Sequence, residues 1–240
     1  LAQRSCLSDP SNRTAPPNFN IISSKAPQIQ LFDVETALRK CKSTSPGPID
    51  IPAFVFREFW HILAPIYHHI WNLSLSTAVF PKCYKQAKLT AIPKTNNASS
   101  PNDIRGISVT PISARLFERI VHKTWILPRI STLGDPLQFA YKPTQSTADC
   151  LITLQHEILT LLDTTEHDGV HCITVDFSKA FDKLDQHIAA TKYKPFIPST
   201  NIQQWLFDFS IHRSQGLFFN NIQHPQLPIH TGCSQGTVGG

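Results

Sequence analysis

Proline constrains the fold of this chain more than any other residue type. Nineteen prolines are spread over its 240 residues, against nine glycines. Each proline fixes the backbone angle φ and removes a hydrogen-bond donor, so it ends or bends a helix and is excluded from the middle of a sheet. The segments between the prolines must therefore be short, and we expect stiff turns to join them. With 41% hydrophobic residues, the chain can bury one sizeable core and has room for a second lobe.

The hydrophobic pattern switches between helical and strand periods along the chain. Helical spacing is found at residues 33–41, 52–73 with a break at Pro65, after Pro111, at 146–162 and at 201–213. The helix at 146 starts with a capping-box pattern, Ser146-x-x-Asp149. Strand-like patterns are found at residues 86–94, 104–110 and 170–177, and in two short strands joined at Asn220-Asn221. Helices mixed with hairpin-linked strands predict an α+β fold, not a regular βαβ series.

Asp176 is the candidate metal ligand on the predicted strand 170–177. Ile173, Val175 and Phe177 share one face of that strand, and Asp176 falls on the other face at its end. A carboxylate fixed there by a sheet could hold a hard cation such as magnesium through oxygen. A single aspartate is also an ordinary sheet-edge residue, so this residue alone leaves both interpretations open.

Positive charge is concentrated in one part of the sequence. Between Lys82 and Lys142 the chain has ten lysines or arginines and three acids, whereas the remainder has twelve basic and fourteen acidic residues. This segment therefore carries all of the basic excess behind the net charge of +5. Such a distribution is typical of a surface that meets phosphates, and the alternative is the solvated face of a basic helix.

The cysteines and histidines indicate neither a disulfide framework nor a common zinc site. The six cysteines are scattered without a C-x-x-C pair, which is typical of reduced thiols inside a cell. The nearest metal-like cluster, His167-Asp168-x-x-His171-Cys172, fits no common spacing, and a plain loop is the favoured interpretation. The sequence has no apolar run of membrane-spanning length and no signal-peptide pattern, so we expect a nuclear or cytoplasmic protein without a membrane partner.

The segment TGCSQGTVGG, residues 231–240, has the Gly232-x-Ser234-x-Gly236 spacing of a serine-hydrolase nucleophile elbow. That elbow needs an acid and then a histidine further along the chain, and only four residues follow Gly236. A hydrolase with Ser234 as its nucleophile is therefore disfavoured, and the segment needs another explanation.

Five segments, taken in order, resemble motifs of reverse transcriptases from non-LTR (LINE-type) retrotransposons. VDFSKAFDKLD, at 175–185, is similar to the first palm motif of that family. TGCSQGTVGG is similar to the palm motif that follows, Gly-x-Pro-Gln-Gly-Ser, with Ser234 in place of the proline. Further matches in the expected order are SPGPIDIP, FPKCYKQAKLTAIPK with IRGISVTPISARLFERIV, and QFAYKPTQSTAD. The resemblance covers about residues 30 to 240, and several motifs in the right order make it specific.

The resemblance implies a right-hand polymerase fold. Fingers would occupy residues 29–145 and the first part of the palm residues 146–240, with the thumb absent and residues 1–28 forming a linker or the tail of an upstream domain. It also implies RNA-directed DNA synthesis, with an RNA template, a DNA primer and deoxynucleoside triphosphates as partners and two magnesium ions as cofactors. It indicates no oligomeric state.

The motif match assigns a role to each site residue. Asp176 would be the catalytic, metal-binding carboxylate, and the carbonyl oxygen of Phe177 would complete the shell of one metal ion. Phe181 would be a steric gate that occupies the space of a ribose 2′-hydroxyl. The remaining residues would contact the nucleotide, at its triphosphate for Lys94 and Arg105 and as the floor beneath it for Gln235 and Gly236.

Four positions around this site have structural explanations of their own. Lys94 could be an ordinary solvated loop lysine, and Arg105 could form a surface pair with Asp103. Asp182 is expected to brace the turn that follows the predicted strand, and Asp185 to lie at a helix N-terminus.

The second metal-binding element of that family, an aromatic-x-Asp-Asp hairpin, would lie beyond Gly240. One carboxylate does not hold two divalent ions against their mutual repulsion and hydration. We therefore interpret the chain as a fragment and expect the 240 residues alone to show no magnesium-dependent primer extension. The alternative is a catalytically silent remnant of the same fold, which binds nucleic acid through the basic segment Lys82–Lys142.

Overall fold

A computed structural model of the chain describes residues 26–48, 51–93, 96–97, 100, 103–164, 168–178, 180–219 and 222–233. The chain divides into two compact units. The first consists of Leu1–Ile126 with Lys179–Gly240, and the second of Leu127–Ser178. The strands that the structure describes all belong to the first unit, together with several helices, so the predicted α+β class is confirmed.

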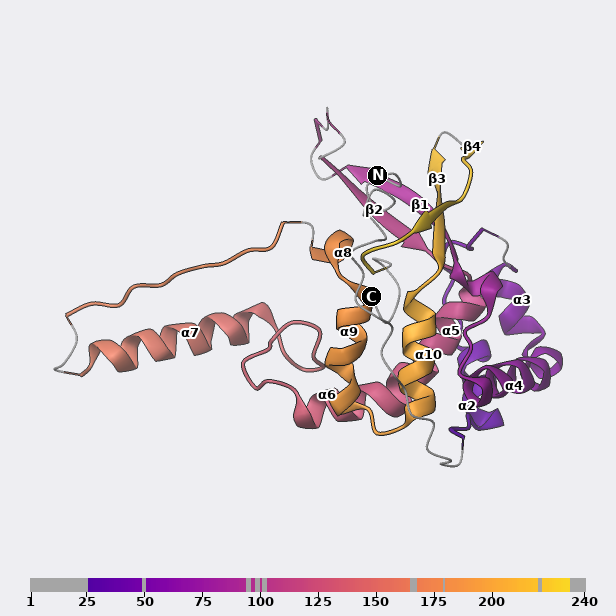
Figure 1. Ribbon diagram of the computed structural model, residues 1–240, viewed down its shortest axis with the longest axis horizontal. Helices are drawn as coiled ribbons and strands as arrows, with labels where there is room; N and C mark the ends of the chain where they lie inside the picture. Colours follow the sequence, from indigo (N-terminus) through magenta and orange to yellow (C-terminus); the bar gives the residue numbers. More distant parts are fainter. Residues whose placement is uncertain are drawn as a thin grey trace. The chain divides into compact units, whose positions relative to one another are not determined.

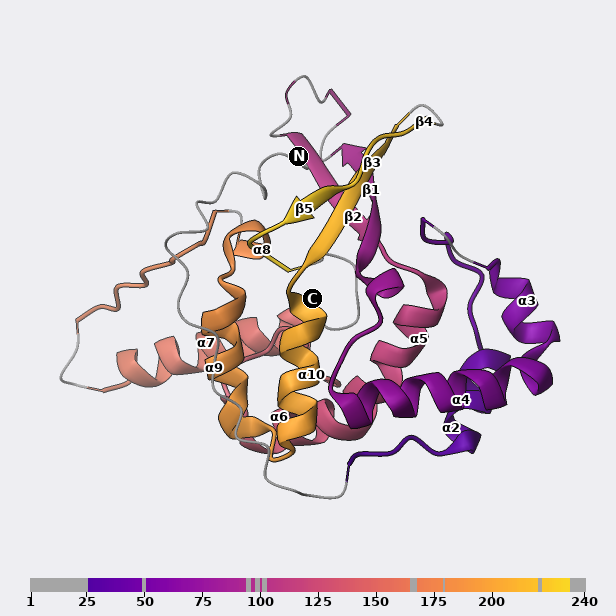
Figure 2. The same ribbon diagram turned by 45° about the vertical axis from the view of Figure 1, so that its right-hand side comes forward.

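The first unit contains a mixed sheet in the order β2-β1-β3-β4 (Figure 1, Figure 2). β1 (Gln86–Pro93) and β2 (Ile104–Val109) form an antiparallel pair over the two segments predicted as strands. β3 (Arg213–Phe219) pairs in parallel with β1. The short strands β4 (Ile222–Gln223) and β5 (Leu227–Ile229) both pair antiparallel with β3. The strand pair on either side of Asn220-Asn221 was predicted, whereas the parallel pairing of β1 with β3 was not.

Most of the α-helices described in the first unit bury residues, whereas α8 (Ala180–Lys183) has no buried residue. The set consists of α2 (Leu31–Arg39), α3 (Ala53–Glu58), α4 (Trp60–Thr77), α5 (Ile112–Val121), α8, α9 (Gln186–Tyr193) and α10 (Thr200–Ser210). Three shorter turns connect them, namely the 3-10 helices η2 (Lys82–Lys85) and η5 (Lys194–Phe196) and the π-helical turn η4 (His122–Ile126). Pro111 is the N-cap of α5, as its position in the sequence predicted.

The predicted helix break at Pro65 is wrong. The helical segment is interrupted at Phe59, and Pro65 lies inside the continuous helix α4. A proline there removes one backbone hydrogen bond of the helix. The buried side chains of Ala64, Trp71 and Leu75 lie on the same helix, and their packing against the core holds it together across the missing bond.

An aromatic cluster forms the centre of the core and joins segments that are far apart in the sequence. The ring of Phe117, on α5, stacks on Trp71 of α4 with ring centroids 5.2 Å apart. Trp205 of α10 meets Phe117 edge-on at 5.0 Å and Phe80 at 5.2 Å. Phe209 packs edge-on against Phe80 at 5.1 Å. These five side chains belong to one buried cluster, so α4, α5 and α10 depend on the same contacts.

The second unit consists of α6 (Leu127–Leu133), α7 (Thr147–Leu162) and the segment that follows α7. The predicted capping box is confirmed, because the Ser146 side chain accepts a hydrogen bond from the Asp149 backbone and the Asp149 side chain accepts one from Ser146. Neither helix of this unit has a buried residue. The apolar stripe of α7 is therefore exposed within the unit.

The predicted strand at 170–177 is wrong. The structure has no strand among residues 168–178, which form an extended segment after α7 (Figure 1). Ile173 is 86% exposed, and Val175 and Phe177 are each 78% exposed. β-branched and aromatic residues favour strands because they fit a pleated, half-buried surface, and no strand in the described part of the chain pairs with this segment. It is extended but unpaired.

Replacing Phe117 by alanine should destabilise the first unit strongly. The ring is fully buried and contacts Trp71, Phe80 and Trp205, so its loss leaves a cavity and costs about 3–5 kcal/mol of the free energy of unfolding. Urea unfolding followed by circular dichroism measures the change. Phe54→Ala is the matched control, because Phe54 is 55% exposed and its loss should cost less than about 1 kcal/mol. Equal losses for both variants would contradict the assignment of the core.

Candidate functional site

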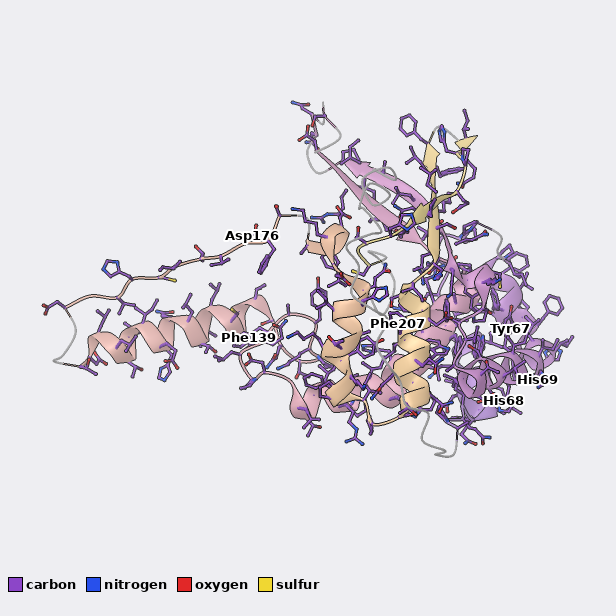
Figure 3. All side chains as sticks on the ribbon, viewed as in Figure 1. Tyr67, His68, His69, Phe139, Asp176 and Phe207 are labelled. Carbon is purple, nitrogen blue, oxygen red and sulfur yellow. The ribbon has the colours of Figure 1, made fainter. Side chains whose placement is uncertain are left out.

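The predicted site residues that the structure describes lie on separate elements. Phe181 lies on α8 and Arg105 on β2, both in the first unit. Asp176 (Figure 3) and the next residue, Phe177, lie on the extended segment of the second unit. The three other predicted site residues lie outside the described residues; they are Lys94, Gln235 and Gly236. Of the predicted site residues, Phe181 contacts the first residues of the segment TGCSQGTVGG.

That contact is a set of hydrogen bonds between residues 181–186 and residues 231–233, here named the Gly232 junction. Two are backbone bonds, in which the Gly232 amide donates to the Leu184 carbonyl at 2.7 Å and the Cys233 amide donates to the Phe181 carbonyl at 2.9 Å. The Thr231 hydroxyl donates to the carbonyl of Asp182 at 3.1 Å. The junction therefore fixes the backbone that carries Phe181 against the first residues of the TGCSQG motif.

Gly232 is required at the junction by its backbone conformation and by its surroundings. Its φ is +84°, in the left-handed region that residues with a side chain rarely adopt. A Cβ atom at this position would overlap the carbonyl oxygen of Phe181 and lie 3.0 Å from the Cα of Asp182. The two segments can approach this closely only because Gly232 has no side chain.

The side chain of Gln186 adds a further hydrogen bond to the Gly232 junction. The side chain is 6% exposed, and its Nε2 donates a hydrogen bond of 2.9 Å to the carbonyl of Gly232, 46 residues away. Gln186 is the first residue of α9, whose N-cap is Asp185. The Asp185 carboxylate accepts hydrogen bonds from the amides of His187 and Ile188, which confirms the prediction that Asp185 lies at a helix N-terminus.

Helix α9 is in turn held against α10. The imidazole of His187 meets the ring of Phe207 edge-on, with 5.1 Å between ring centroids. The Tyr193 hydroxyl donates to the carbonyl of Gln203 at 3.1 Å, and burial raises the pKa of that hydroxyl well above its usual value. The tyrosine therefore stays neutral and keeps its proton for this bond.

The thiol of Cys233 is unsuited to nucleophilic chemistry. Burial raises its pKa, a backbone hydrogen bond opposes this in part, and the nearby Asp182 carboxylate adds a smaller rise. The thiol is therefore protonated at neutral pH. Ser234, the candidate nucleophile of the disfavoured hydrolase interpretation, lies outside the described residues.

Arg105 lies on the exposed side of the β1–β2 pair. It is opposite Ile92 in the register, and Lys94 directly follows Pro93, the last residue of β1. Asp103, its alternative partner, uses one carboxylate oxygen to accept a hydrogen bond of 3.0 Å from the amide of Ser100. Arg105 therefore lies at the end of the strand pair where β1 ends, and Lys94 is the next residue in the sequence after β1.

The described residues do not by themselves assemble a divalent-metal site. Among them, no group of three histidine, cysteine, aspartate or glutamate side chains lies close enough to hold an ion. The carboxylate of Asp176 and the carbonyl of Phe177 are exposed and could each supply one oxygen ligand. Of the predicted metal-like cluster, Asp168, His171 and Cys172 are exposed, and His167 lies outside the described residues.

Sequence reasoning missed the residues that build the junction. Gln186 belongs to no motif, and Thr231 is the first residue of TGCSQGTVGG but had no role assigned to it. Their partners lie more than forty residues away in the chain. The sequence predicted only that Asp185 lies at a helix N-terminus. This located the start of α9 but did not show that the side chain of Gln186 contacts Gly232.

No helix in the described part of the chain is long and apolar enough to cross a membrane.

Two comparisons with known proteins agree. Residues 92–240 match the family described as reverse transcriptase (RNA-dependent DNA polymerase). A relative in Drosophila melanogaster, the retrovirus-related Pol polyprotein from type-2 retrotransposable element R2DM, is 33% identical over 149 residues. That alignment covers 62% of this chain and 13% of the relative, so the chain spans a small part of that protein's length. The matched family segment includes Phe181, Gln186 and the Gly232 junction.

Gly232→Ala should open the junction. The left-handed conformation alone costs an alanine about 1–2 kcal/mol, and the overlap with the Phe181 carbonyl adds to this. Native-state hydrogen exchange should show the protection of the Gly232-position and Cys233 amides falling by about tenfold or more. Gly169→Ala is the control, because a Cβ there meets no atom within 4 Å. Unchanged protection in Gly232→Ala would show that the junction is not formed as described.

Proposed function

The chain belongs to the reverse transcriptase family, as a reverse transcriptase domain of a non-LTR retrotransposon, and we propose that it supplies the nucleotide-binding part of an RNA-directed DNA polymerase. The observation that carries the proposal is the Gly232 junction. It joins the segment after Asp176 to the start of the TGCSQG motif, and both lie within the matched residues 92–240. Two motifs that the resemblance assigned to one site thus have a physical connection in the fold.

The proposed reaction is the template-directed transfer of a deoxynucleotide to a primer. The partners are an RNA template, a DNA primer and deoxynucleoside triphosphates, and the protein acts in the nucleus or cytoplasm. The right-hand arrangement belongs to the proposal, with fingers at 29–145 and the first part of the palm at 146–240. The basic segment Lys82–Lys142 supports it, because it would meet the phosphates of these partners.

Magnesium is the proposed cofactor, with Asp176 and the carbonyl of Phe177 as the ligands that this chain supplies. Bound magnesium would lower the pKa of the primer hydroxyl and offset charge on the α-phosphate. Asp176 is exposed, so its carboxylate is accessible to an ion from solvent. A two-metal site needs carboxylates besides Asp176, and the proposal includes that the 240 residues alone do not extend a primer.

The nucleotide would be held from several sides. Arg105 and Lys94, at the end of the β1–β2 pair, would bind its triphosphate, and the planar fork of Arg105 suits paired phosphate oxygens. Gln235 and Gly236 would form the floor beneath it. Phe181 is half-buried, and its backbone carbonyl is fixed by Cys233, so its ring would have a defined place as the gate against a 2′-hydroxyl.

A non-catalytic remnant that binds nucleic acid is the second candidate function. It is favoured by the basic segment Lys82–Lys142, whose ten lysines and arginines against three acids can bind phosphates without a metal site. Both functions predict salt-dependent binding to nucleic acid, so binding alone does not separate them.

Asp176→Asn separates the two candidates when it is made in a completed enzyme, that is, in a chain that also contains an aromatic-x-Asp-Asp hairpin and a thumb. In a polymerase it should lower deoxynucleotide incorporation on a primed RNA template by about 100-fold or more, because a metal ligand contributes several kcal/mol to the transition state. Asp168→Asn is the control, since it removes the same charge from another exposed residue of the same segment. Equal activity of Asp176→Asn and Asp168→Asn would refute the role of Asp176.

Phe181→Val tests the gate in the same protein. A smaller side chain leaves room for the 2′-hydroxyl, so the preference for deoxynucleotides over ribonucleotides should fall by about tenfold or more. The Gly232 junction should survive, because it uses only the backbone of Phe181. Phe219→Val, at the exposed end of β3, is the control and should keep the preference. An unchanged preference in Phe181→Val would remove the gate assignment while leaving the polymerase assignment intact.

A further inference from the structure

A pocket of about 300 Å³ opens in the first unit where η2, the end of α10 and the start of β3 come together. Its lysines, Lys82 and Lys85, belong to the basic segment Lys82–Lys142, and the residues proposed for catalysis and for holding the nucleotide do not line it. Its lining combines two apolar residues with six polar or charged ones, namely Val79, Phe80, Lys82, Lys85, Gln86, Asp208, His212 and Ser214.

Each oxygen of Asp208, the one acid among the described lining residues, already accepts a hydrogen bond. One accepts from Lys85 Nζ at 2.9 Å, and the other accepts from the backbone amide of Phe80 at 2.6 Å. Asp208 therefore fixes Lys85 and the start of η2, and its charge is offset by the ammonium group of Lys85.

The remaining polar groups are mainly donors. The ammonium group of Lys85 has three N–H donors, and one of them donates to Asp208. Lys82 is exposed and provides a second ammonium group. His212 and Ser214 can donate from the imidazole and the hydroxyl. A pocket with several spare donors and two cations favours an anion with several acceptor oxygens.

The charged groups around Lys85 also favour an anionic ligand, because two of them are cations. Burial lowers the pKa of Lys85, Asp208 opposes this, and repulsion from Arg213 and Lys82 lowers it further. Arg213 lies between two lining residues and is 3% exposed. Its Nη1 donates to the carbonyl of Phe209 at 2.8 Å, whereas Nε and Nη2 have no hydrogen-bond partner among the described residues. The carboxylate of Glu118 interacts with Arg213, so Arg213 adds little net charge. The pocket lining itself has two cations, Lys82 and Lys85, and one acid, Asp208.

The backbone at the pocket rim is held in an unusual conformation. His212 has a φ of +54°, in the left-handed region, between the last turn of α10 and the first residue of β3. Such a conformation costs about 1 kcal/mol or more for a residue with a side chain and persists only where the surroundings impose it. Here it directs the chain so that His212 and Ser214 both reach the pocket.

We propose that this pocket binds a phosphate group, held by Lys82, Lys85 and His212. The phosphate could be part of a nucleic-acid backbone or a free phosphate ion, and the chemistry of recognition is the same for both. The pocket shares no residue with the proposed catalytic site. Phosphate can bind there without catalysis. A failed polymerase assay would therefore contradict the proposed function, whereas a failed phosphate-binding assay would contradict only the proposed pocket ligand.

The test uses the 240-residue chain and two probes at constant ionic strength. Inorganic phosphate is titrated while the midpoint of thermal unfolding is measured, and a fluorescent twelve-nucleotide single strand is titrated by anisotropy. Phosphate should raise the unfolding midpoint in a saturable way. Lys82→Gln should weaken binding of at least one probe by about tenfold, because a charge-assisted hydrogen bond is lost.

Two further variants make the test decisive. Lys42→Gln removes the same charge from an exposed lysine outside the pocket and should leave both titrations unchanged. His212→Asn keeps a residue that tolerates the left-handed conformation, but its side chain is shorter and its N–H donor reaches less far. It should weaken the binding of the same probe as Lys82→Gln does. Weakening confined to the oligonucleotide identifies a backbone phosphate, and weakening confined to inorganic phosphate identifies the free ion. Wild-type binding of both probes by Lys82→Gln and His212→Asn would overturn the proposal.

Discussion

The packing of Phe117 against Trp71, Phe80 and Trp205 is the interaction on which the rest of the first unit depends. These rings come from α4, α5, α10 and the segment before η2, so a single cluster brings together parts of the chain up to 134 residues apart. Nearby, the ion pair between Lys85 and Asp208 ties η2 to α10 at 2.9 Å. With η2 and α10 fixed in this way, β1 and β3, which follow them in the chain, meet as parallel neighbours.

The site follows from that arrangement by short steps along the chain. β3 leads through β4 and β5 to Thr231, and α10 holds α9 through contacts such as His187 with Phe207. The start of α9 and the end of the strand segment then meet at Gly232, where Gln186 closes the contact. The motif that the sequence presents as a possible catalytic serine elbow is, in its described part, a backbone docking element. Its glycine is explained by close approach rather than by nucleophile geometry.

The features that sequence could predict are local ones. The alternation in β1 and β2, the capping box at Ser146 and the cap at Asp185 depend on residues within a few positions of each other, and all three are confirmed. The strand predicted around Asp176 failed because a strand needs a partner, and the sequence carries no sign of whether one is present. The pair of Lys85 with Asp208 could not be foreseen, since 123 residues separate its members. The motifs identified the family without locating these contacts.

The proposed polymerase function is tested most directly by sequencing the transcript beyond the codon for Gly240. The account predicts that the reading frame continues and, within a few tens of codons, encodes an aromatic-x-Asp-Asp motif followed by a helical segment. That motif would supply the carboxylates that Asp176 needs to hold two ions. A stop codon or a frameshift before such a motif would contradict the account, and the protein would then be a nucleic-acid-binding remnant of the family.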